Sequence, residues 1–279
     1  MLTTQSIESD CVPDDDYFEQ LKQRFGLATD KTRDDLRSEL AEAPVEPLSV
    51  DKILREEPDK LKVHLLDVFE GLNLSSEERE EVTHLRRIVK VHSLADAEIE
   101  WLALVIQRRA GPRYLFAVLA RFWQERSSIK RDVGYLARAS RCWRDAKQPE
   151  QALSCLKGSE KGAAQKLLAI IHTCRAAALK DMLHLLAAED EANRALRLND
   201  EDPHPFNVLG AVFYLKRDFK TGDDYYKRAE ERGSFGGPTR GELEQVLESM
   251  SGEDKHALAR HLLGVDSKKY AWVAKAIRL

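Results

Sequence analysis

From about residue 48 onward, apolar residues recur every three to four positions, the period of amphipathic α-helices. One stripe of this kind contains Leu61, Leu65 and Val68. Another lies in residues 96–109, and the segment 114–125 is apolar on most sides, as expected for a central helix. No convincing run of alternating apolar and polar residues suggests a β-strand. Because only 14 Gly and 9 Pro are present to form turns, the pattern predicts an all-α fold.

The segment 203–235 has the clearest pattern in the chain. An apolar helix is followed by a polar turn at residues 216–218 and then by a second amphipathic helix. The apolar, small and aromatic residues that mark the two helices are Leu209, Gly210, Phe213, Tyr225, Tyr226 and Ala229. This spacing predicts a helical hairpin in which small residues let the two helices approach each other closely.

Two weaker versions of this pattern precede it, in residues 132–158 and 169–200. The small residues Ala152, Ala188 and Gly222 occupy equivalent positions, at intervals of 36 and 34 residues. The pattern resembles the tetratricopeptide repeat (TPR), which has a period of about 34 residues. Because one such repeat cannot bury its apolar face alone, the resemblance implies stacked hairpins in an all-helical solenoid.

The resemblance covers about a third of the chain and has three departures from the family pattern. Gly222 replaces the usual alanine, and Arg175 stands where a large apolar residue is normal. In addition, the turn region 180–185 lacks its glycine.

The sequence therefore predicts four parts. Residues 1–48 form an acidic, weakly ordered and partly flexible segment with few large apolar residues. Residues 49–131 form a helical N-terminal region, and residues 132–235 form the TPR-like repeats. Residues 236–279 follow a glycine-rich break and form a C-terminal helical cap, which a solenoid needs at its end.

Local signals place several helix ends. Ser75, with Glu78 three residues later, predicts a capping box. In the C-terminal cap, Ser251 and Asp266 are candidate N-caps, and Gly264 is a candidate C-terminal stop.

Charge is unevenly distributed along the chain, although the net charge is only −4. Residues 1–84 carry 22 acidic and 10 basic side chains, a net charge of −12. Residues 85–180 carry 8 acidic and 19 basic side chains, a net charge of +11. The basic middle segment is either a solvated face or a site for an acidic ligand, which could be a protein segment, a nucleic acid or the chain's own acidic N-terminus.

No catalytic residue, cofactor-binding residue or metal ligand emerges from the sequence. Phosphate loops, nucleophile elbows and HExxH motifs are absent, and the eight histidines are scattered. The four cysteines contain no CxxC pair, so we expect free, buried thiols. No window approaches the roughly 20 apolar residues of a membrane span, and the acidic start does not resemble a signal peptide. We therefore expect a cytoplasmic protein that is not an enzyme and takes no cofactor.

Six residues are candidates for partner binding. Three arginines recur every third position on one predicted helix, and their forked hydrogen bonds suit carboxylate or phosphate ligands. If the TPR resemblance holds, Arg141 and Arg144 line the concave surface, together with polar residues of the last repeat. The candidates are Arg138, Arg141, Arg144, His204, Asn207 and Tyr214.

The function expected from this pattern is a non-enzymatic adaptor, scaffold or regulatory subunit that binds a partner protein through the concave surface. The partner would be an acidic peptide or a larger complex. One alternative is a nucleic-acid-associated accessory factor that uses the basic middle segment. A second is an effector or enzyme component with an unrecognised site in residues 49–127.

Overall fold

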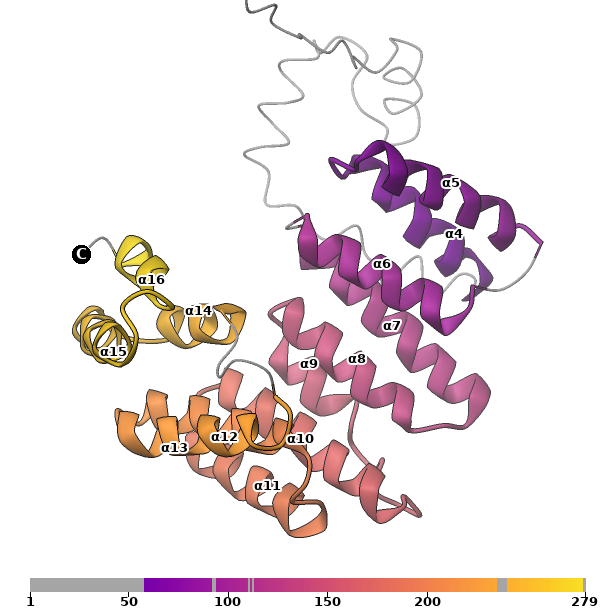
Figure 1. The fold of residues 1–279 in the computed structure, drawn as a ribbon. Coiled ribbons are helices and arrows are strands. Elements are labelled where there is room, and N and C mark those ends of the chain that lie inside the picture. The colour runs from indigo at the N-terminus through magenta and orange to yellow at the C-terminus, as the bar shows by residue number, and fades with distance from the viewer. Residues whose placement is uncertain (1–57, 92–93, 110, 112, 235–239, 278–279) are drawn as a thin grey trace, which may run out of the picture. The chain divides into compact units, whose positions relative to one another are not determined.

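The computed structural model describes residues 58–277 apart from residues 92–93, 110, 112 and 235–239. The described residues form thirteen α-helices and one short 3-10 helix, and no strand occurs among them (Figure 1). The predicted all-α fold is confirmed for this part of the chain. The acidic segment 1–48, with its suggested contact to the basic region, lies outside the described residues.

The first helices form the region that precedes the hairpins. They are α4 (Pro58–Val68), the 3-10 helix η1 (Phe69–Gly71), α5 (Ser76–Val89), α6 (Asp96–Arg108) and α7 (Arg113–Lys130). The capping box is confirmed, because the Ser75 hydroxyl accepts from the Glu78 N–H at 3.2 Å and the Glu78 carboxylate accepts from the Ser75 N–H at 2.9 Å. Helix α7 packs against α4, α6 and α8, and its buried side chains make it the central helix of this region.

Three helical hairpins follow (Figure 1). They pair α8 (Gly134–Asp145) with α9 (Pro149–Ser154), α10 (Gln165–Asp181) with α11 (Leu185–Leu198), and α12 (Pro203–Leu215) with α13 (Phe219–Glu230). Helix α10 also packs against α8, α9 and α12, and α11 packs against α12, so consecutive hairpins are in contact.

The three hairpins share one turn geometry. Lys147, Leu183 and Arg217 have φ values of 59°, 60° and 66°, in the left-handed region that few residues other than glycine adopt. In each turn this residue donates its N–H to the carbonyl three positions earlier, at 2.8 to 3.0 Å. The following residue donates to the carbonyl five positions earlier, at 2.9 to 3.0 Å. The turn therefore recurs at intervals of 36 and 34 residues, and its left-handed residue is not a glycine in any of the three hairpins.

Close contact between α12 and α13 depends on two glycines. A Cβ atom at Gly210 would lie 2.7 Å from the Tyr226 ring, and one at Gly222 would collide with the Tyr214 ring. The two tyrosine rings meet edge to face, with their centroids 5.3 Å apart. The departure at Gly222 therefore has a physical reason, because the Tyr214 ring fills the space that an alanine methyl group would need.

Arg175 of α10, the second departure, is paired with the segment that connects α9 to α10. Its guanidinium pairs with Glu160 and donates to the Leu156 carbonyl at 2.9 Å. The charged head is thus partnered inside the fold, and an apolar residue is not required at this position.

The C-terminal helices are α14 (Arg240–Glu248), α15 (Gly252–Val265) and α16 (Ala271–Ala276). Ser251 caps α15 as predicted, by accepting from the Asp254 N–H. The other two predicted signals were wrong. Gly264 lies inside α15, and Asp266 accepts from two N–H groups of the turn before α16 instead of capping that helix, which begins at Ala271.

Candidate protein-binding surface

One position in each hairpin carries a large polar side chain. Arg144, Lys180 and Tyr214 each lie three residues before the left-handed turn residue, on the first helix of the hairpin. Because α10 packs against both α8 and α12, these positions lie on neighbouring helices. Two predicted binding residues, Arg144 and Tyr214, thus occupy positions equivalent to that of Lys180, which was not among the predicted binding residues.

Arg144 and Lys180 share one carboxylate. The Arg144 Nε lies 2.6 Å from Asp181 Oδ2, and the Lys180 Nζ lies 2.6 Å from Asp181 Oδ1. Lys180 is only 5% exposed, so its charge is held inside the fold. Burial opposes ionisation of Asp181, but the charges and hydrogen bonds of the two cations outweigh it and lower the pKa of this carboxyl. We call these three residues the buried charge cluster.

The buried charge cluster carries more positive than negative charge. Burial lowers the pKa of the Lys180 ammonium, whereas the charge of Asp181 acts in the opposite direction. Burial also raises the pKa of the neighbouring Asp145, against the influence of Arg141 and Arg144. Arg144, a predicted partner-binding residue, is therefore already paired with a carboxylate of the same chain.

Arg138 lies on an exposed part of α8. Its Nε is 2.7 Å from Glu100 Oε1 on α6, and both side chains are about half exposed. The guanidinium also lies over the rings of Trp123 and Tyr135, 5.3 and 5.5 Å from their centroids. This stacking orders the guanidinium while it stays accessible to solvent.

Arg141, one helical turn further on, is exposed. Its charge acts on the Asp145 carboxyl and on the Cys142 and Cys174 thiols, which places it beside the buried charge cluster. We refer to Arg138 and Arg141 together as the α8 arginine surface.

The three candidates on α12 have different environments. His204 is exposed in the first turn of the helix. Asn207 is buried, and its Nδ2 donates to the Ser234 hydroxyl at 3.1 Å. Tyr214 is 1% exposed, and its hydroxyl donates to Asp223, whose other oxygen lies 2.8 Å from His261 Nε2. Asn207 and Tyr214 therefore form part of the interior, and only His204 is exposed to solvent.

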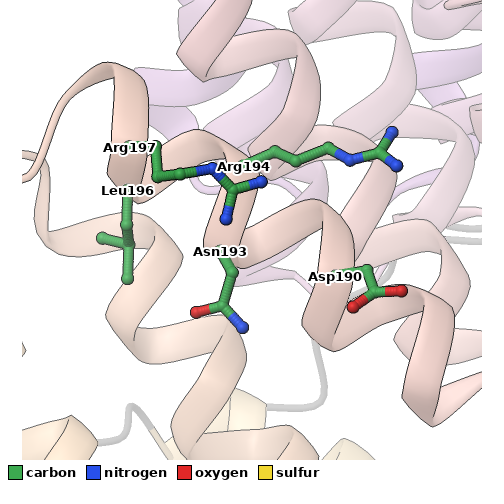
Figure 2. Close-up of a pocket in the computed structure, with 5 residues that line it drawn as sticks. All are labelled: Asp190, Asn193, Arg194, Leu196 and Arg197. Atoms are coloured by element: carbon green, nitrogen blue, oxygen red, sulfur yellow. The ribbon is translucent and has the colours of Figure 1, made fainter.

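A surface hollow of about 480 Å³ lies on α11 (Figure 2). Its lining residues are Asp190, Asn193, Arg194, Leu196 and Arg197, which all come from this one helix. Arg194 pairs with Glu191 at 3.0 Å. The polar groups lie along a single helix face and do not converge from several elements, so the hollow defines no site for a small molecule.

The thiols of Cys142, Cys155 and Cys174 are free. Burial raises their pKa values to about 12, 12 and 11, so each stays protonated at neutral pH. Among the described residues, no group of three or more His, Cys, Asp or Glu side chains could hold a metal ion. The described helices also include none that is both long and apolar enough to cross a membrane.

Comparison with known proteins gives no relative. No protein-family model matches the chain, and no curated protein or solved structure is similar to it.

Proposed function

We propose that this protein is a non-enzymatic adaptor or regulatory subunit whose α8 arginine surface binds an acidic segment of a partner protein. The observation that carries the proposal is the recurrence of one left-handed turn at Lys147, Leu183 and Arg217. Helical hairpins repeated at such intervals are typical of TPR-like arrays, which present extended surfaces to other proteins.

The α8 arginine surface suits a carboxylate ligand. Arg138 is held in place by two aromatic rings, so less side-chain entropy is lost when a ligand binds. Its present carboxylate, Glu100, is exposed, and an exposed ion pair contributes only about 0–1 kcal/mol. A partner carboxylate can therefore replace Glu100 at low cost and reach Arg141 one turn away.

The proposal uses fewer residues than the sequence analysis selected. Arg144 and Tyr214 are already paired with carboxylates of the chain, and Asn207 is buried. The binding role is therefore assigned to Arg138 and Arg141.

The test is capture of partners from the native cell lysate, with and without nuclease, by the full chain and two variants. The first variant carries Arg138→Glu and Arg141→Glu. The control carries Lys157→Glu and Lys161→Glu, which make the same charge change at two exposed residues outside α8. We expect a stoichiometric protein that survives nuclease, is lost with the first variant and is retained by the control. Equal retention or equal loss in the two variants would contradict the proposal.

The nucleic-acid alternative rests on the +11 charge of residues 85–180. Part of that charge is neutralised within the fold, because three arginines of the segment pair with carboxylates outside it. They are Arg86, Arg109 and Arg144, which pair with Asp67, Glu78 and Asp181. This pairing favours the adaptor function. Binding to nucleic acid at about 50 mM salt that weakens steeply by 200 mM would favour the alternative instead.

A further inference from the structure

Helix α14 covers part of the hairpin region. Its buried residues Leu243, Val246 and Leu247 belong to one cluster with Ala211 and Tyr214 of α12, which also includes residues of α13, α15 and α16. At its end, Glu248 Oε2 lies 3.2 Å from Lys147 Nζ, in the turn between α8 and α9. The helix is therefore in contact both with the third hairpin and with the turn of the first.

The surface beneath α14 has an excess of positive charge. Arg144, Lys147 and Lys180 lie at equivalent ends of the first two hairpins, and Asp181 is the carboxylate that two of them share. The glutamates of α14 complement this charge. Glu248 pairs with Lys147, and the charge of Glu242 acts on the buried ammonium of Lys180. The apolar residues of α14 thus pack against the apolar residues of α12, and the glutamates that flank them on α14 lie near the cations of the first two hairpins.

Two polar atoms of the third hairpin have no hydrogen-bond partner among the described residues. They are the Asn207 Oδ1 and the Tyr226 hydroxyl, in side chains that are 8% and 2% exposed. Buried polar groups are normally hydrogen-bonded, so each atom is a place where another ligand could make a contact that α14 does not make. Both atoms belong to the hairpin that supports α14.

We propose that the surface beneath α14, formed by α12 and by the turn between α8 and α9, is a binding site for an acidic amphipathic helix, with α14 as its resident occupant. The partner helix has an acidic residue, apolar residues at positions i, i+3 and i+4, and an acidic residue at i+5. In α14 this pattern is Glu242, Leu243, Val246, Leu247 and Glu248. The site goes beyond the proposed function and uses neither Arg138 nor Arg141, so either proposal can fail without the other.

Helix α14 has the advantage of being tethered. A short linker gives a resident segment an effective concentration on the order of millimolar. A partner helix therefore replaces it only if it binds better, and hydrogen bonds to Asn207 and Tyr226 offer such a gain.

The test uses the full chain and a fluorescent synthetic peptide with the sequence of residues 239–250. A chain with Glu242→Lys and Glu248→Lys has a weakened resident helix. Glu244→Lys is the matched control on the same helix, because Glu244 pairs with Arg240 in an exposed i, i+4 contact. We expect the peptide to bind the double variant at least about tenfold more tightly than the wild type, and the control to stay within about twofold of it. A peptide in which the residues corresponding to Glu242 and Glu248 are changed to lysine should bind neither the wild-type chain nor the double variant.

If the double variant unfolds cooperatively but does not bind the peptide, the proposal is overturned. Concentration-dependent dimerisation of the double variant would also overturn it, because the face would then bind a second copy of the chain. Hydrogen exchange of the wild-type chain provides a measurement that needs no variant. Amides of α14 should exchange at least about tenfold faster than those of α12, because an exchangeable helix opens without global unfolding. Equal protection of the two helices would also overturn the proposal.

Discussion

The hairpins α10–α11 and α12–α13 share one turn but differ in the side chain three residues before it. In α12–α13, Tyr214 packs its ring against Gly222. In α10–α11, the equivalent residue is Lys180, a buried cation held by Asp181, and the residue equivalent to Gly222 is Ala188. The backbone turn therefore does not determine whether this position carries an aromatic ring or a charge. The side chain at this position depends on its neighbour, which is Gly222 beside Tyr214 in one hairpin and the carboxylate of Asp181 beside Lys180 in the other.

The largest effect is expected from removing the carboxylate of the charged hairpin. Asp181→Ala would leave Arg144 and the buried Lys180 without their shared partner. Breaking a buried ion pair in this way costs about 3 kcal/mol of unfolding free energy. Urea denaturation checks this value, with Glu100→Ala as the control, because the exposed pair with Arg138 should cost less than about 1 kcal/mol. Similar losses in the two variants would show that Asp181 does not hold the cluster.

The aromatic hairpin should be sensitive to a single methyl group. Gly222→Ala places a Cβ against the Tyr214 ring and should destabilise the fold by about 2 kcal/mol, although alanine favours helices. Gly264→Ala is the matched control, because this helical glycine has open space around it and should stabilise by about 0.5–1 kcal/mol. Thermal unfolding distinguishes the two. A Gly222→Ala chain as stable as the control would refute the close approach of α12 and α13.

Acid should weaken the charged hairpin selectively. The pKa of Asp181 is lowered in the folded state, so its contribution is present above the unfolded value of about 3.9 and is lost as pH falls through the folded value. Asp145, whose pKa burial raises, acts in the opposite direction and opposes stability as pH rises above about 3.9. Unfolding free energies measured between pH 5 and pH 2 should therefore fall less steeply in Asp181→Asn than in the wild type. Identical slopes would exclude Asp181 as a source of the acid sensitivity.

The smallest effect is expected at the exposed contact between the first hairpin and α14. Lys147→Gln removes the ion pair with Glu248, whose two side chains are 39% and 65% exposed, so stability should change by less than about 1 kcal/mol. A double-mutant cycle with Glu248→Gln measures the pair itself. A coupling well above that value would mean that the contact fixes α14 more firmly than an exposed ion pair can.

The sequence predicted the helices well where period and caps agree. The capping box at Ser75 and the hairpin of residues 203–235 are both present in the structure. Helix ends in the cap were less predictable, since Gly264 continues α15 instead of ending it. A glycine with open space around it can remain helical, and the sequence does not show that space.

The candidate site was less predictable than the fold, because exposure depends on tertiary partners. Arg138 and Arg144 are both arginines on α8, yet the side chain of Arg138 is about half exposed whereas that of Arg144 is only 23% exposed and shares Asp181 with Lys180. Asp181 looks like a solvated helix end in the sequence. Alignment of the three turns would have drawn attention to it, because it follows Lys180, the equivalent of Arg144 and Tyr214.

The most direct test of the proposed function is a hydrogen-exchange footprint of the chain in complex with the partner captured from the lysate. The account predicts slower exchange in the α8 segment that contains Arg138 and Arg141, and loss of this protection together with binding in the double charge-reversal variant. Protection confined to α11 or α13, with α8 unchanged, would contradict it.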